Sequence, residues 1–484
     1  MYGRVARALC LSKGAVAGSI PRPVPMLYHL FLPLERVVSG FRLFRYVSFR
    51  AAFAAILAFL VATVVGPGII ATLRRRKIAG TALTSQVEVD RQRMSKQDVP
   101  TMGGVILLIG VALSALLFAR LDTPSTWITI GAFLAFGALG AADDWKKLTK
   151  PGSHGMSERG KILGQLAISI AVIGVLYVVG SAEGGRPWLR GASAKTSPYL
   201  DPHHRKHVVV AGETLADVAA AEYGDASRAP EVAAANSLAR GGEAALEAVP
   251  GQVLDVPLLW RDPTDRHGAD LQIPFAKGFC LDLGLFLIPF AILVIVGTSN
   301  AVNLTDGLDG LAIGCTATVA TTLTVAAYLA SRADFSRELY LFHVPMAGEL
   351  AIIGAALVGG SLGFLWFNGH PAQVFMGDTG SLAIGGILGV LAVAIHHEGT
   401  LLLAGGLFVA EALSVIWQRA WFKGTRRAAR RRGEENPTGK RWFRCAPLHH
   451  HVQMGGLHEN KVTVRFWIVS VVCALFALAA LKIR

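Results

Sequence analysis

The chain has 484 residues, of which 52% are hydrophobic and only 17% are charged. A soluble protein of this composition would expose large apolar patches, so the composition indicates a membrane protein. The formal net charge is +14, but the basic residues lie in short loops beside long apolar runs, which fits the positive-inside rule better than nucleic-acid binding. The five cysteines form no C-x-x-C pair, so neither a disulfide framework nor a zinc site is indicated.

The first 25 residues are basic and broken by prolines, and they lack the apolar stretch of about 7–15 residues that a secretory signal needs. We expect a disordered extension over 1–25, with translation starting at Met1 or at Met26.

Ten apolar segments follow, each near the length of roughly 20 residues that spans a membrane. The loops after the first, third and ninth segments are basic, whereas those after the second, sixth and eighth hold few charges. The positive-inside rule then places the exits of odd-numbered segments in the cytoplasm and both termini outside, in the periplasm. We predict an all-α polytopic membrane protein with ten transmembrane helices at 48–71, 102–120, 127–142, 162–180, 279–298, 309–330, 348–367, 379–396, 400–420 and 464–482.

The connection after the fourth segment, 183–275, is polar, slightly acidic and long enough for a small domain. Within it, the residue pattern of 207–257 predicts a βααβ unit. The valine-rich run 207–210 favours a first strand, the run 212–214 can cap a helix, and the run 253–256 favours a last strand. This run resembles a LysM module, a peptidoglycan-binding fold. The loop charges place it in the periplasm; the alternative is an external insertion without glycan affinity.

Polar side chains gather at the ends of odd-numbered segments, on the predicted cytoplasmic side. Such groups at membrane depth are costly and tend to be functional, so their convergence predicts one site. They are Asp143 and Asp144 after the third segment, Asn300, Asn303, Asp306 and Asp309 after the fifth, Asn368, Phe375 and Asp378 after the seventh, and His449, His450 and His451 after the ninth.

The acids have structural alternatives. Adjacent carboxylates at a helix C-terminus meet the negative end of the helix dipole, so Asp143 and Asp144 need a cation, or Lys146 and Lys147, to offset the repulsion. Asp378 could cap its own helix, or it could hold Mg²⁺ beside the flanking glycines.

The run 300–310 offers amides and carboxylates that could bond a uracil edge, ribose hydroxyls or a cation, but it lacks the final Glu of an EF-hand. The three histidines could bond phosphate oxygens or form a metal-affinity tract. Lys96 and Thr101 could also contact phosphate, whereas Glu411, inside the ninth segment, has no evident role. Oxygen ligands without cysteines favour Mg²⁺, and separated acids with cationic donors suit phosphoryl transfer.

Taken together, the motifs resemble those of the phospho-N-acetylmuramoyl-pentapeptide transferases of peptidoglycan synthesis. The resemblance covers 26–182 and 276–484, the membrane transferase domain with spans 1–4 and 5–10, and it leaves out the extension and the insert. The motifs are Asp143-Asp144, the runs 100–104, 300–312, 363–368 and 371–378, and the Ala-Pro-Leu-His-His-His run 446–451.

The resemblance implies a Mg²⁺-dependent enzyme of the bacterial inner membrane that converts UDP-N-acetylmuramoyl-pentapeptide and undecaprenyl phosphate to lipid I and UMP. It implies Asp378 as the principal Mg²⁺ ligand with Asp143 and Asp144 beside it, and Asp143 as the base for the lipid phosphate. The resemblance also implies nucleoside recognition by Asn300, Asn303, Asp306, Asp309, Asn368 and Phe375, with Phe375 stacking on uracil, and phosphate or substrate contacts by Lys96, Thr101, His449, His450 and His451.

Two features depart from the family pattern: Asp98-Val99 replace Gly-Thr, and the loop between spans 9 and 10 is longer and more basic, which suits anionic lipid or substrate. Partners beyond the substrates are membrane lipid and, through the insert, peptidoglycan; a homodimer is left open. The alternatives are a polyprenyl-phosphate N-acetylhexosamine-1-phosphate transferase and, more remotely, an ion-coupled transporter. The sequence also leaves open whether the lipid phosphate attacks directly or Asp378 acts as a covalent nucleophile.

Overall fold

The structure is a computed structural model that describes residues 39–75, 99–149, 155–182, 199–223, 250–260, 270–275 and 280–482, with gaps at 340, 345 and 435, together with a few single residues. The predicted extension 1–25 and Lys96 lie outside the described residues. The main helices are α3 (Val47–Arg75), α5 (Gly104–Phe118), α6 (Pro124–Thr149), α7 (Glu158–Ala182), α10 (Leu287–Thr305), α11 (Leu311–Ala330), α12 (Ala333–Leu339), α13 (Ala347–Asn368), α14 (Gly377–Ala394), α15 (Glu398–Ala404), α16 (Gly406–Arg431), α17 (Leu448–Gln453) and α18 (Glu459–Lys482).

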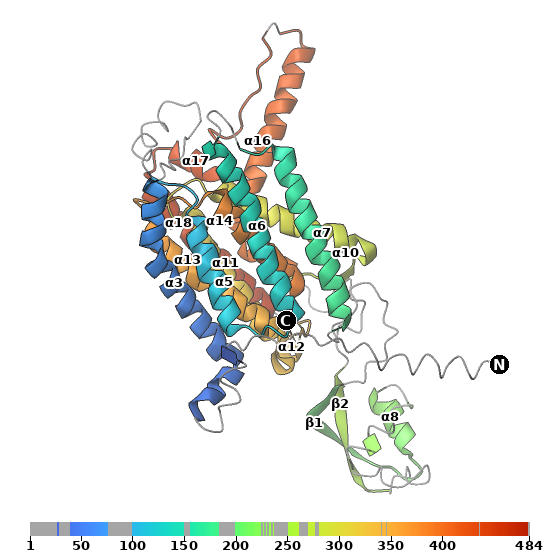
Figure 1. Cartoon of the computed structure of the whole chain (residues 1–484). Coiled ribbons are helices and arrows are strands. Elements are labelled where there is room, and N and C mark those ends of the chain that lie inside the picture. Colours follow the sequence, from blue (N-terminus) through green and yellow to red (C-terminus); the bar gives the residue numbers. More distant parts are fainter. Residues whose placement is uncertain are drawn as a thin grey trace, which may run out of the picture.

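The described helices form a bundle of membrane-spanning length (Figure 1). Within the described ranges, eight helices are long and apolar enough to cross a membrane, and α15 with α16 makes a ninth if this pair, bent by 78°, counts as one span. The polytopic membrane fold is therefore confirmed. Every one of the ten predicted segments overlaps a helix, but α5 has only 15 residues, so ten crossings and the outward termini stay predictions.

Two helices form the centre of the bundle. α13 packs against α3 and α11, and α14 packs against α6 and α10. Both central helices are largely buried because glycine and alanine dominate their contact faces and let neighbouring backbones approach closely. At Gly140 of α6, an added Cβ would collide with the carbonyl oxygen of Asp378. This close approach brings the C-terminal half of α6 against the first turn of α14.

The insert forms a small unit of its own beyond one end of the bundle (Figure 1). Strand β1 (Tyr199–Val208) pairs antiparallel with β2 (Val253–Trp260), and α8 (Leu215–Tyr223) supplies Leu215 and Val218 to a core with Leu254. The first strand begins earlier than the predicted residue 207, because its backbone continues to pair with β2 as far as Trp260. Only part of 224–249 is described, so the likeness to a LysM module remains a prediction. A short hairpin, β3 (Asp270–Gln272) with β4 (Cys280–Asp282), precedes α10.

Candidate active site

Three carboxylates converge where α6 meets α14. Asp143 and Asp144 lie near the C-terminal end of α6, and Asp378 lies in the first turn of α14. One oxygen of each lies within 4.8 Å of the others. Acids that lie more than 230 residues apart in the sequence therefore form one cluster. Their positions at the ends of odd-numbered segments had predicted that they converge.

Asp144 is held by the N-terminus of α14. Its carboxylate accepts hydrogen bonds from the Asp378 N–H at 3.2 Å, the Thr379 N–H at 2.9 Å and the Thr379 hydroxyl at 2.7 Å. These are the unpaired donors that begin any helix, and the helix dipole favours an anion there. The sequence alternative in which Asp378 caps its own helix is wrong, because the N-cap is Met376 and no side chain caps it.

Two lysines cover the other carboxylates. The Nζ of Lys147 lies 2.6 Å from Asp143 Oδ2 and 2.9 Å from Asp378 Oδ2. The Nζ of Lys161, from the first turn of α7, lies 3.2 Å from Asp143 Oδ2 and 2.6 Å from Asp378 Oδ2. Sequence analysis named Lys147, with Lys146, as a possible neutralising partner of Asp143 and Asp144, but it counted Lys161 only as a loop charge. The i,i+4 spacing of Asp143 and Lys147 was a usable signal, whereas nothing local indicated Lys161.

The cluster fits a hard divalent cation. The donors are carboxylate oxygens from three residues, which Mg²⁺ prefers, and they are close enough for one ion to reach all three. The ammonium groups of Lys147 and Lys161 lie beside Asp143 and Asp378 and offset part of their negative charge. Two monovalent cations against three carboxylates leave a net negative charge that a divalent ion would offset.

The amides of α10 reach the cluster at one point. Asn303 donates to Asp378 Oδ1 at 2.6 Å and to the Ser381 hydroxyl at 2.8 Å. Asn300, one turn earlier, donates instead to Gln165 Oε1 of α7 at 2.8 Å, and Gln165 in turn donates to Ser299 at 3.2 Å. Asn303 therefore contacts the acids directly, whereas Asn300 joins α10 to α7.

The two acids of the α10–α11 loop differ. Burial, followed by the negative charges of Asp378, Asp144 and Asp309, raises the pKa of the half-buried Asp306 to about 8. Asp309 is buried instead in a network, where its Oδ2 lies 3.0 Å from His370 Nδ1 and its N–H donates to Glu459 at 2.9 Å. Asp306 belongs electrostatically to the acid cluster, while Asp309 ties its loop to the segments around 370 and 459.

The segment before α5 runs beside the segment before α14. The Phe375 N–H donates to the Pro100 carbonyl at 2.8 Å, and the Gly103 N–H donates to the Phe375 carbonyl at 2.8 Å. These backbone bonds bring Thr101 next to Phe375, as one site requires. Asn368 has a scaffolding contact, since its Oδ1 accepts the Gly310 N–H at 3.1 Å and its Nδ2 donates to the Val374 carbonyl at 2.8 Å.

The three histidines on α17 separate. His449 is buried and lies against Gly307 of the α10–α11 loop. His450 approaches Gln453 at 3.3 Å, and His451 Nδ1 accepts the Arg444 N–H at 3.1 Å. The structure therefore brings His449 to the polar loop, and it turns His450 and His451 toward their own segment.

Known proteins share much of this sequence. The family model described as glycosyl transferase family 4 matches residues 264–396. A phospho-N-acetylmuramoyl-pentapeptide-transferase of Desulfotalea psychrophila is 38% identical over 459 residues, which cover 95% of this chain and 100% of the relative. Proteins of the same name from Desulforapulum autotrophicum and Nitratidesulfovibrio vulgaris are each 37% identical with the same coverage. The chain belongs to the phospho-N-acetylmuramoyl-pentapeptide-transferase family.

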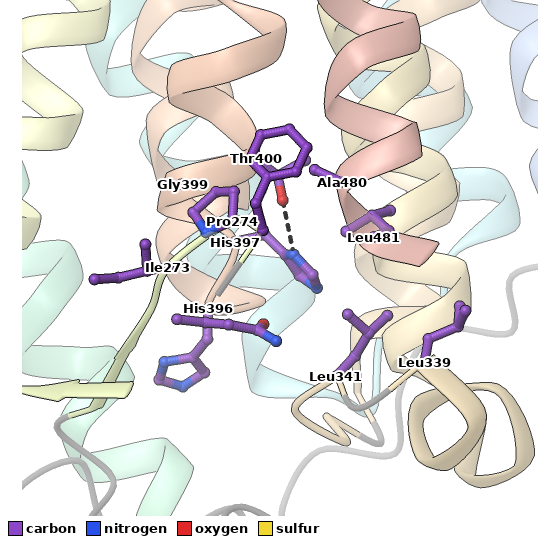
Figure 2. Close-up of a pocket in the computed structure, with 12 residues that line it drawn as sticks. Ile273, Pro274, Leu339, Leu341, His396, His397, Gly399, Thr400, Ala480 and Leu481 are labelled. Atoms are coloured by element: carbon purple, nitrogen blue, oxygen red, sulfur yellow. Dashed lines mark hydrogen bonds between the residues drawn. The ribbon is translucent and has the colours of Figure 1, made fainter. Parts of the chain in front are cut away.

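The structure also has a pocket that contains none of the three clustered aspartates. That pocket is lined by Pro274, His396, His397, Thr400 and Leu481 (Figure 2). These residues come from the α14–α15 break, the end of α18 and the segment after β3, at the end of the bundle opposite the acid cluster. Most residues that line it are apolar, and none of its described lining residues carries a carboxylate.

Proposed function

We propose that the chain transfers phospho-N-acetylmuramoyl-pentapeptide from its UDP-linked donor to undecaprenyl phosphate, giving lipid I and UMP in peptidoglycan synthesis. The observation that carries this proposal is the cluster of Asp143, Asp144 and Asp378 with Lys147 and Lys161, in a chain whose relatives bear the name of this transferase. Both substrates carry phosphates, so a site with a divalent cation and lysines suits them.

Mg²⁺ would be held by Asp378 with Asp143 and Asp144, and when bound it would neutralise charge on the donor diphosphate. Asp144 fixes the first turn of α14, which orients Asp378 toward the substrate side. Lys147 and Lys161 bind phosphoryl oxygens as charge develops on them. Asp143 accepts the proton of the lipid phosphate at its carboxylate, beside the ammonium groups of Lys147 and Lys161.

Donor recognition falls to the polar loops around the cluster. Asn303 and Asp306 take the nucleoside side, with Asn300, Asp309 and Asn368 holding their loops in register. Phe375 stacks on uracil beside Thr101. Phosphate and substrate contacts come from Lys96 and His449, whereas His450 and His451 contact their own segment.

The orientation proposed from loop charge puts this site in the cytoplasm and the insert in the periplasm of the bacterial inner membrane. The insert would tether the enzyme to wall glycan without taking part in turnover. Deletion of 190–270 should therefore leave lipid I synthesis intact in an inserted protein, and abolished synthesis would contradict this role.

A comparison of two nucleotide sugars tests the substrate. Purified protein with undecaprenyl phosphate should release UMP from radiolabelled UDP-muramoyl-pentapeptide and not from UDP-N-acetylglucosamine. The reverse preference would favour the N-acetylhexosamine branch of the superfamily.

A further inference from the structure

Glu411 is an acid inside α16 to which no motif assigns a role. Its side chain is fully buried, with 0% of its surface exposed. Its Oε1 accepts the backbone N–H of His449 at 3.1 Å and lies 3.3 Å from His449 Nδ1. Among the described residues, its Oε2 has no hydrogen-bond partner. The intramembrane acid therefore touches the first histidine of the Ala-Pro-Leu-His-His-His run.

A carboxyl group in this position needs a partner. If Glu411 were neutral, its O–H would be left without an acceptor, and if it were ionised, its charge would be buried without a counterion; both cost free energy. The imidazole of His449 is the group that meets either need. Its ring nitrogens, like Glu411 Oε2, make no hydrogen bond within the described part of the chain. Hydrogen bonds of active sites are often loose without substrate and tighten when it binds.

His449 connects Glu411 to the polar loop. Its Nδ1 side faces Glu411, and its Nε2 lies so close to Gly307 that a Cβ added there would collide with it. Gly307 follows Asp306 in the α10–α11 loop. His449 therefore bridges Glu411 and this loop, with Nδ1 toward the carboxylate and Nε2 toward Gly307.

We propose that Glu411 is a positioning residue that fixes the orientation of the His449 ring, so that Nε2 faces the 303–309 loop proposed for the nucleoside side of the donor. This inference rests on the proposed function. The arrangement follows the general pattern in which a buried carboxylate fixes the orientation of a histidine that acts at its other nitrogen.

Steady-state kinetics of purified variants test the proposal. Glu411→Gln keeps the shape but removes the charge, and it should lower kcat/KM for the UDP-linked donor by about 10- to 100-fold, in the range found for groups that orient a functional histidine. Glu411→Asp keeps the charge and should recover part of the loss. His449→Gln should lose at least as much, and the double variant Glu411→Gln/His449→Gln should lose no more than His449→Gln alone.

Glu349→Gln is the matched control, because Glu349 is another buried glutamate, paired with Arg50 in a different part of the bundle. It should lower thermal stability while the folded fraction keeps its kcat/KM. Wild-type kcat/KM in Glu411→Gln, or losses that multiply in the double variant, would overturn the inference. The affinity of these variants for UDP can be measured without turnover. It should fall by a similar factor in Glu411→Gln and in His449→Gln. Absence of product from the wild type would instead contradict the proposed function.

Discussion

The three clustered aspartates have different surroundings, and these suggest different work. Asp144 is occupied by the backbone and hydroxyl donors of Asp378 and Thr379, so it organises the start of α14. Asp143 and Asp378 contact the ammonium groups of both Lys147 and Lys161, whereas Asp144 lies 3.5 Å from that of Lys147. The sequence could predict that these acids meet, because they fall on one side of the membrane. It could offer Lys147 as a neutralising partner, but it could not predict Lys161, because this lysine reaches Asp378 only through the packing of α6, α7 and α14.

Lys161→Met tests the part played by this missed lysine. Removing one of two cations from beside Asp143 and Asp378 should lower kcat by about 10- to 100-fold, because charge on the transferring phosphoryl group loses a stabilising partner. The control is Lys146→Met, since Lys146 makes no ion pair within the described residues. UMP release measures both. Equal activity of the two variants would show that Lys161 takes no part in turnover and only balances the charge of Asp143 and Asp378.

At the level of helices, the length of an apolar segment predicted a helix reliably, because a segment that spans a membrane must satisfy its own backbone hydrogen bonds. Each of the ten predicted segments overlaps a helix, but the fifth is displaced, since 280–282 form β4 and α10 begins only at Leu287. The sequence did not show that the ninth segment is broken at Gly405, between α15 and α16. It also did not show that α16 continues past the predicted residue 420 to Arg431, where basic residues suit the negative end of the helix dipole.

A buried ion pair that sequence analysis did not identify joins three helices. Arg50 of α3 donates to both oxygens of Glu349 in α13 at 2.7 and 2.8 Å and to the Phe118 carbonyl at the end of α5 at 3.1 Å. Arg50→Met leaves Glu349 as an uncompensated buried charge and should cost about 3–5 kcal/mol of stability. The double variant Arg50→Met/Glu349→Met should recover most of it. Thermal unfolding in detergent measures both, and an unchanged midpoint in Arg50→Met would contradict the assignment.

The insert carries a pH-dependent contact. The hydrogen bond to Glu213 raises the pKa of His207, and the Val210 N–H together with His207 lowers the pKa of Glu213. A raised histidine pKa stabilises the fold at low pH and loses that effect as pH rises through the folded value, whereas a lowered glutamate pKa loses it as pH falls. The contact should therefore stabilise most between roughly pH 4.3 and 6.5.

Limited proteolysis of the full-length protein across this range measures the effect. Wild-type insert should be cleaved faster at pH 8 than at pH 6 after correction for protease activity, and His207→Gln should lose this difference. A difference that persists in His207→Gln would show that another group controls the insert.

The two ends of the molecule carry different parts of the chain. The acid cluster, the polar loops and α17 lie at one end of the bundle, and the insert lies at the other (Figure 1). Loop charges along the sequence anticipate this division, because basic loops mark the end that bears the acids. A transporter would be expected to hold its acids near the membrane midplane, whereas the cluster lies at the end of α6 and the start of α14. This placement supports an enzyme that meets a soluble donor and a lipid acceptor at one membrane face.

The most direct measurement is UMP release by the purified protein with undecaprenyl phosphate and UDP-muramoyl-pentapeptide, with and without Mg²⁺. The account predicts release that requires Mg²⁺ and falls at least 100-fold in Asp378→Asn, because this residue is proposed as the principal ligand. No UMP from wild type, or full activity in Asp378→Asn, would contradict it.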